Sequence, residues 1–173
     1  MSEFKKYTIG QQLKESEDSF KTFGRTERTE LIKRLFACFF KDTNYSVYAN
    51  KMGDESKWHL ITDEQEWLFD LIIVDTEESE FENIPFITKT VLSLESELEG
   101  NIKAVIDDFQ KLLIANSDYK VMVFNCHSTE LKSLTSYMET NIKNYKKANG
   151  IFYLVSFLND LCTFELIEII TDN

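Results

Sequence analysis

The pattern of apolar and polar positions along this chain predicts helices that alternate with strands. Apolar residues recur at helical spacing in four stretches, residues 9–20, 26–40, 102–115 and 128–147. Short runs rich in β-branched and aromatic residues predict strands over residues 45–51, 67–74, 90–98, 119–125, 151–158 and 163–170. The last two runs are joined near Asn159-Asp160, which predicts a closing hairpin. Residues 75–83 are rich in Asp and Glu and predict a solvated loop.

After the short N-terminal helix, the predicted order is a helix, three strands, a helix, a strand, a helix and a hairpin. This order predicts an α/β fold with a mixed central sheet flanked by helices. The 173 residues are 43% hydrophobic and include only five glycines and one proline, which predicts one domain without a flexible linker. Within residues 1–173, residues 1–24 are an N-terminal extension, 26–125 the core, and 126–173 a C-terminal helix and hairpin.

The formal charge of −11 is distributed unevenly. Residues 1–60 carry a net charge of +2, residues 61–110 carry −12, and residues 111–173 carry −1. A protein that binds nucleic acid needs Lys and Arg at the phosphates, so this balance counts against a nucleic-acid partner unless metals neutralise the acidic region. The N-terminal residues include no apolar h-region, and no stretch approaches about 18 apolar residues, so we expect a cytoplasmic protein with no membrane partner.

Three carboxylates interrupt the apolar pattern of the predicted strands. Glu95 and Glu97 share one strand face, about 6.5 Å apart along the strand. Asp70 lies in the apolar run of the preceding strand, where a buried carboxylate must be hydrogen-bonded, paired or metal-bound. If the two strands are neighbours, the three side chains converge on a hard-cation site suited to Mg²⁺ or Mn²⁺. The alternative is that Glu95 and Glu97 line the wet face of a half-buried sheet.

At these residues the chain resembles the restriction-endonuclease-like, or PD-(D/E)xK, phosphodiesterase superfamily. The family pattern is an acidic residue that opens one strand, followed by Glu-x-Lys on the next; here it reads Asp70, then Glu95-Ser96-Glu97. Glu97 departs from the usual lysine, and some type II restriction enzymes have the same Glu-x-Glu. Bacterial members of the superfamily are similar in three stretches, residues 94–97, 107–113 and 120–124. The predicted element order matches the superfamily core over residues 26–125.

The resemblance implies a divalent-metal site with Asp70, Glu95 and Glu97 as catalytic residues and metal ligands. It also implies that the helix over residues 26–40 contributes a glutamate, for which we prefer Glu27 over Glu30; capping of the helix explains both without a metal. In some members the missing strand lysine comes from a following helix. Lys111 is nearly opposite the apolar stripe of that helix, so we do not expect it to fill this role. Asp108 and Gln110 are at the borders of the stripe.

Two functions follow from these residues. The first is a Mg²⁺- or Mn²⁺-dependent phosphodiesterase, a nuclease, in which Asp70 and Glu95 hold the metal and Glu97 positions the attacking water or completes the site. The alternative is a non-catalytic binding or regulatory protein on a degenerate nuclease-like fold, favoured by the missing lysine and the acidic charge. The sequence has no glycine-rich phosphate loop, nucleophile elbow or CxxC pair that would indicate another chemistry.

The remaining reactive residues predict structural roles. Cys38, Cys126 and Cys162 are far apart and lie in apolar runs, which favours buried thiols over a disulfide or zinc site. A single histidine in a strand is typical of a structural residue, and we interpret His59 in this way. Residues 52–54 predict a turn.

Overall fold

The computed structural model describes residues 4–41, 43–49, 68–79 and 85–171. The four helices of this described part are α1 (Lys6–Thr22), α2 (Arg25–Cys38), α3 (Ile102–Ile114) and α4 (Ser128–Asn144). The six strands are β1 (Ser46–Ala49), β2 (Leu71–Glu77), β3 (Phe86–Glu97), β4 (Ser117–Cys126), β5 (Ile151–Leu158) and β6 (Thr163–Ile170). The α/β class and the predicted order of elements are therefore confirmed.

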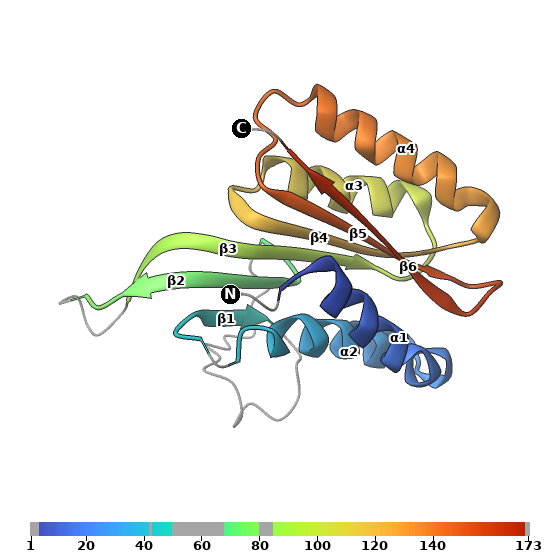
Figure 1. Cartoon of the computed structure of the whole chain (residues 1–173), viewed down its shortest axis with the longest axis horizontal. Helices are drawn as coiled ribbons and strands as arrows, with labels where there is room; N and C mark the ends of the chain where they lie inside the picture. The colour runs from blue at the N-terminus through green and yellow to red at the C-terminus, as the bar shows by residue number, and fades with distance from the viewer. Residues whose placement is uncertain (1–3, 42, 50–67, 80–84, 172–173) are drawn as a thin grey trace.

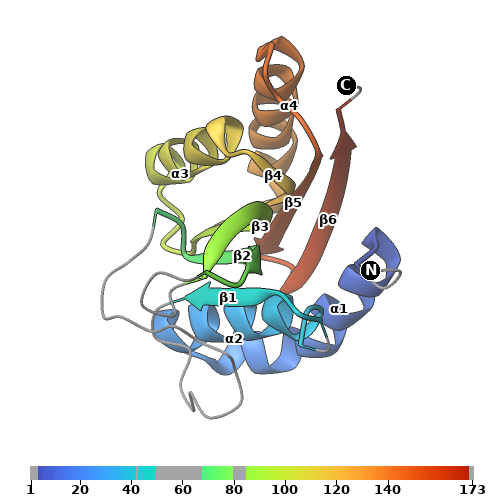
Figure 2. The same cartoon turned by 90° about the vertical axis from the view of Figure 1, so that its left-hand side faces the viewer.

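One mixed sheet holds the six strands in the order in which they occur along the chain. The pairs β1/β2, β2/β3 and β5/β6 are antiparallel, whereas β3, β4 and β5 run parallel to one another. The parallel strands are connected by α3 and α4, as parallel neighbours require a crossover. In two perpendicular views, α1 and α2 cover one face of the sheet and α3 and α4 cover the other (Figures 1 and 2).

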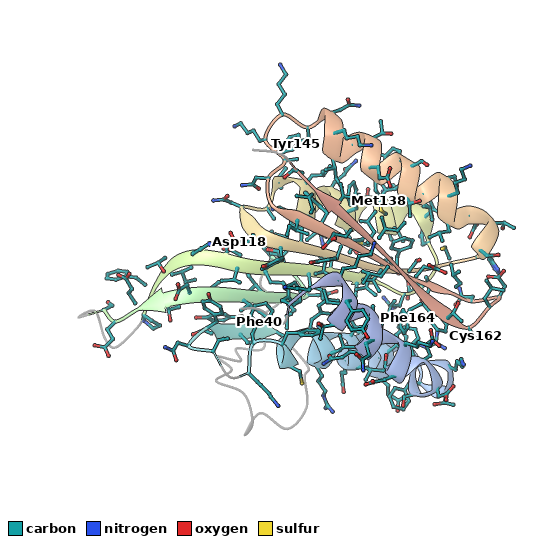
Figure 3. The ribbon with its side chains drawn as sticks, viewed as in Figure 1. Phe40, Asp118, Met138, Tyr145, Cys162 and Phe164 are labelled. Atoms are coloured by element: carbon teal, nitrogen blue, oxygen red, sulfur yellow. The ribbon has the colours of Figure 1, made fainter. Side chains whose placement is uncertain are left out.

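Each face of the sheet carries its own hydrophobic core, and side chains fill the space between the layers (Figure 3). On the α1/α2 face, the fully buried side chains include Ile9, Phe20, Phe36, Leu94 and Val121. On the α3/α4 face, Val105, Phe109, Met138, Phe124 and Leu154 pack together. Because both faces are covered, the central strands are almost continuously apolar, which is why their sequences do not alternate cleanly.

Several predicted boundaries differ from the structure. The predicted loop over residues 75–83 is wrong at its start, because Asp75 to Glu77 belong to β2 and pair with the first residues of β3. β3 is correspondingly longer than predicted, and two irregularities in the β2/β3 ladder accommodate this extension. The fourth helix ends at Asn144 rather than at residue 147. The closing strands, by contrast, have the predicted bounds.

All three cysteines are free thiols, but only part of their predicted placement is confirmed. Cys126 is buried and Cys162 is partly buried, whereas Cys38 is exposed at the end of α2, so the core prediction is wrong for Cys38. His59 and the turn predicted at residues 52–54 lie outside the described residues. None of the helices in the described ranges is long and apolar enough to cross a membrane.

Candidate functional site

The candidate site lies where β3 ends, beside the residues that lead into β2. The two strands are antiparallel, and Leu71 pairs with Leu94, so the start of β2 lies next to the end of β3. This register brings Asp70, just before β2, close to Glu95 and Ser96. Helix α3 follows β3 and begins at Ile102, after the Asn101 side chain caps it by accepting the Lys103 amide at 3.0 Å. The residues of the candidate site therefore come from the segment before β2, the end of β3 and α3, and α2 adds Lys33 beside Asp70.

Asp70 is held by hydrogen bonds rather than left as an isolated charge. Its Oδ2 atom accepts the Ser96 amide at 2.8 Å and the Ser96 hydroxyl at 2.6 Å. Its Oδ1 atom lies 3.7 Å from Nζ of Lys33, a residue of α2 that is only 3% exposed. Asp70 precedes β2 instead of lying within it. Its carboxylate therefore accepts the Ser96 amide just beyond the last β2/β3 strand pair. A charge-assisted pair of hydrogen bonds of this kind fixes its orientation.

Glu95 is buried beneath α3, with only 4% of its surface exposed. Its Oε1 atom lies 3.2 Å from Nζ of Lys111, and the same ammonium lies 2.8 Å from Oδ1 of Asp108. Burial, and then the nearby Asp70 carboxylate, raise the pKa of Glu95 to about 8, although Lys111 offsets part of the effect. Glu95 therefore holds a proton at neutral pH for a large part of the time.

Lys111 contacts Glu95, which its angle on α3 did not predict. Its backbone position is nearly opposite the apolar stripe, but four methylene groups let the ammonium reach back to Glu95 while 44% of the side chain stays exposed. Partial burial would lower the pKa of Lys111, yet the Asp108 and Glu95 carboxylates together raise it above the ordinary value. Asp108, expected at the border of the stripe, does reach this group, whereas Gln110 is exposed.

Glu97 lies at the end of β3 and is 8% exposed. Its Oε1 atom accepts the amide of Glu99 at 2.7 Å. Burial raises the pKa of Glu97; the nearby Arg25 opposes this rise, while Asp108 and Asp70 add to it. Arg25 itself forms an ion pair with Glu99, which connects the start of α2 to the end of β3.

Glu27 has a different environment from the other three predicted ligands. It is exposed in the first turn of α2, and its Oε2 atom accepts the Gly24 amide at 2.7 Å. This contact satisfies one of the free amides at the start of the helix. Glu30 lies one turn away from Arg34, at 3.7 Å. Glu27 thus has the helix-terminal role that its position predicts without a metal, whereas this prediction is wrong for Glu30, which lies beyond the first turn and pairs within the helix.

The four buried or partly buried carboxylates act on one another electrostatically. Asp70 and Asp108 each raise the pKa of both Glu95 and Glu97. Glu95 Oε1 receives no well-directed hydrogen bond from any described residue, although Lys111 lies beside it. The buried Ser93 hydroxyl on the same strand also has no hydrogen-bond partner among the described residues. Oxygen donors in such surroundings fit a hard divalent cation. As arranged here, however, no three His, Cys, Asp or Glu side chains of the described residues form a ready metal-binding group.

The raised pKa of Glu95 gives a first prediction, for stability. Between the ordinary value of 4.5 and about 8, the folded protein retains a proton that the unfolded chain has released. The stability contributed by this proton is complete below pH 4.5 and is lost as the pH rises through 8. Glu95→Gln removes the titrating group, so its melting temperature relative to wild type should rise by several degrees between pH 5 and pH 9.

The matched control for this measurement is Glu165→Gln, which changes an exposed glutamate on β6. Its melting temperature should follow that of wild type at every pH. A Glu95→Gln difference that stays constant from pH 5 to pH 9 would show that the folded protein does not hold the proton on Glu95.

Comparisons of the chain with protein-family models, with curated proteins and with solved structures found no match.

Proposed function

We propose that this chain is a divalent-metal-dependent phosphodiesterase that cleaves nucleic acid, on a restriction-endonuclease-like core that runs from α2 to β4. The observation that carries the proposal is the 3.2 Å contact between Lys111 and Glu95. Glu-x-Glu chains lack the strand lysine of the family pattern. Here Lys111 of α3 places an ammonium group beside Glu95, which is one of the proposed metal ligands. This contact supports a catalytic site that includes both acidic residues and a lysine.

In this proposal, Asp70 and Glu95 hold Mg²⁺ or Mn²⁺, and Glu97 and Asp108 are the further carboxylates within electrostatic reach. A metal bound there polarises a phosphate and lowers the pKa of a water molecule. The Ser96 hydrogen bonds orient the Asp70 carboxylate. Glu95 must lose its proton for metal binding, so binding below about pH 8 releases protons to solvent.

Lys111 has two roles in this mechanism. Without the metal, its ammonium pairs with Asp108 and lies beside Glu95. If a divalent cation were bound by the carboxylates, the partly exposed Lys111 side chain would be available to the substrate phosphate, where its ammonium would stabilise the negative charge of the transition state. Bound metal also reduces the negative potential of residues 61–110, which otherwise repels a polyanion.

A specific observation favours the alternative, a non-catalytic binding or regulatory protein. Two lysines already lie beside the acidic residues, since Lys33 contacts Asp70 and Lys111 contacts Glu95. If these ammonium groups replace a metal permanently, the cluster is an internal ion network with no catalytic role. A measurement of metal binding distinguishes the metal-dependent phosphodiesterase from the non-catalytic protein.

Isothermal calorimetry with Mg²⁺ and Mn²⁺ tests the proposal. We expect saturable heats for wild type, and at least a tenfold loss of affinity in Asp70→Asn and Glu95→Gln, because each removes one charged ligand oxygen. Asp107→Asn is the matched control, since Asp107 is on α3 but faces solvent and pairs with Lys103. Equal and negligible heats in wild type and Asp70→Asn would show that there is no metal site. The non-catalytic function would then be favoured.

A further inference from the structure

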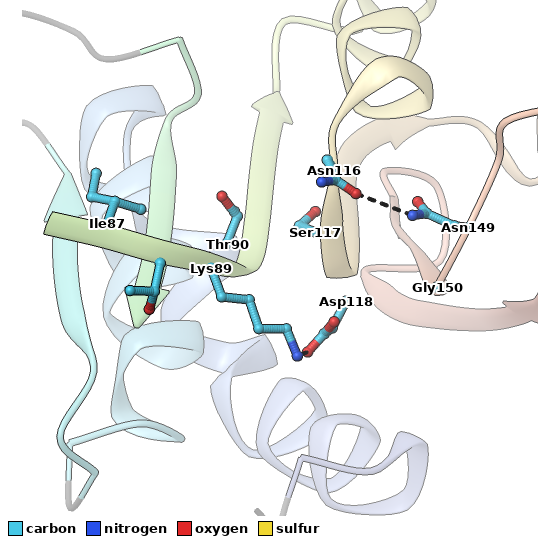
Figure 4. A pocket seen from close by; sticks show the side chains of 9 residues that line it. Ile87, Lys89, Thr90, Asn116, Ser117, Asp118, Asn149 and Gly150 are labelled. Atoms are coloured by element: carbon cyan, nitrogen blue, oxygen red, sulfur yellow. Dashed lines mark hydrogen bonds and ion pairs between the residues drawn. The ribbon is translucent and has the colours of Figure 1, made fainter. Parts of the chain in front are cut away.

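A second polar site lies at the other end of the sheet, away from the carboxylates. Figure 4 shows the side chains that line it. It is a pocket of about 380 Å³, formed by the first half of β3, the start of β4 and the turn before β5. In the β3/β4 register, Thr90 pairs with Ser117 at this end, and Glu97 pairs with Phe124 at the other. Seven residues of strand separate the two ends, which is roughly 20 Å. The pocket is therefore independent of the proposed phosphodiesterase site.

The wall of this pocket is held in place by a buried lysine. Lys120 is fully buried, and its ammonium donates to the backbone oxygen of Ser117 at 2.5 Å. It also donates to the backbone oxygen of Asn149 at 2.6 Å and to its side-chain oxygen at 3.1 Å. Burial lowers the pKa of Lys120 to about 8, which reflects the cost of placing a charge there. Lys120 thus connects the start of β4 to the turn before β5.

Gly150 brings the same two segments into close contact. Its φ of +82° is a conformation that other residues rarely adopt, and a Cβ atom here would lie 2.4 Å from the backbone oxygen of Asp118. Asn149 adds a side-chain contact, because its Nδ2 atom donates to Oδ1 of Asn116 at 3.2 Å (Figure 4). Together with Lys120, these contacts preorganise the pocket, and a preorganised pocket loses little entropy when a ligand binds.

The groups that line the pocket define the ligand that fits it. Ser117 is buried, and its hydroxyl oxygen, which has no hydrogen-bond partner among the residues the structure describes, lies behind the pocket surface. Lys89 and Asp118 form a 2.5 Å ion pair and are half-exposed, so each has hydrogen-bonding capacity left. The lining thus presents one cation and one anion side by side, with hydroxyl and amide groups around them. Among the described residues that line it, Ile87 is the single large apolar side chain.

We propose that this pocket binds a small zwitterion of the free α-amino acid class. The ligand ammonium contacts Asp118, the ligand carboxylate contacts Lys89, and the Asn116 amide accepts or donates a further hydrogen bond. A simple anion would be repelled by Asp118, and a simple cation by Lys89. A nucleobase would lack an aromatic or broad apolar surface on which to stack. The volume is at the small end of the range for ligand pockets, as a compact polar molecule requires.

Backbone amide NMR titration of the whole chain tests this inference. Each free proteinogenic amino acid is added at millimolar concentration, beside N-acetylglycine, which is only an anion, glycinamide, which is only a cation, and inorganic phosphate. We expect saturable shifts at Ser117 and Gly150 with at least one amino acid. N-acetylglycine, glycinamide and phosphate should each bind at least tenfold more weakly. No saturable shift with any amino acid, or equal binding of N-acetylglycine or phosphate, would overturn the proposal.

Variants then locate the contacts. Asp118→Asn and Lys89→Met should each weaken binding of that amino acid by about tenfold or more, since each removes one charged contact. Lys103→Met is the matched control, because it removes a similar exposed lysine–aspartate pair from α3 and should leave the affinity unchanged. Unchanged affinity in Asp118→Asn and Lys89→Met, with folded protein in both spectra, would overturn the assignment of the ligand to this pocket.

Discussion

Glu95→Gln is expected to abolish Mn²⁺-dependent cleavage, lowering the rate on mixed DNA and RNA substrates by about 1,000-fold or more. Glu95 is the most buried of the proposed ligands, and glutamine keeps its shape but cannot supply a charged oxygen. Metal catalysis contributes several kcal/mol to transition-state stabilisation, and each 1.36 kcal/mol is a factor of ten in rate. Asp107→Asn, on the exposed side of α3, should cleave at the wild-type rate.

Variants of Lys111 and Glu97 test the role of the lysine in cleavage. Lys111→Met should lower the cleavage rate without abolishing metal binding, because it removes only the ammonium. Adding Glu97→Lys to Lys111→Met returns the family's usual Glu-x-Lys, and cleavage that reappears would show that the two positions serve one function. If Glu97 is a required ligand, the double variant stays inactive, and Glu97→Gln is inactive too. If wild type and all variants are folded but none cleaves, the catalytic proposal fails.

Lys120→Met is expected to lower the free energy of unfolding by about 3 kcal/mol, a fall in melting temperature of roughly 6–12 °C. Methionine has a similar length, but it would remove the donor that now satisfies one backbone oxygen of Ser117 and two partly buried oxygens of Asn149. The measurement is thermal unfolding at pH 7, where the ammonium is charged. Lys132→Met, an exposed lysine on α4, is the control and should change the melting temperature little. A Lys120→Met protein as stable as wild type would show that these hydrogen bonds contribute nothing net.

The sequence predicted the backbone better than the site, for a physical reason. Strands β5 and β6 have the expected bounds because their apolar runs end where the hydrogen-bonded ladder ends. β2 continues past its apolar run, because pairing with β3 can hold polar residues such as Asp75 and Thr76 in a strand. Apolar periodicity reflects burial, so it does not reveal the part of a strand whose side chains are exposed.

Side-chain reach explains the lysine contacts that the sequence did not predict. The angle around a helix places a Cβ atom, but it does not place an ammonium about 5 Å away from it, so the angle alone does not predict the contact of Lys111 with Glu95. Lys33 was missed, although it lies between Ile32 and Leu35 in the apolar stripe of α2, where a charge needs a partner. Asp70 interrupts an apolar run in the same way. Pairing the two interruptions would have predicted their contact, whereas the Ser96 hydrogen bonds depend on strand register.

The agreement between strand order in the sheet and strand order in the chain affects how the protein can fold during synthesis. Each strand pairs with the one made just before it, so no strand has to be inserted between two that are already paired. Each addition closes a connection between consecutive elements, which keeps the entropy lost at each step small. The sheet can therefore grow from β1 towards β6 as the ribosome releases the chain, with α3 and α4 covering each new parallel strand as it forms.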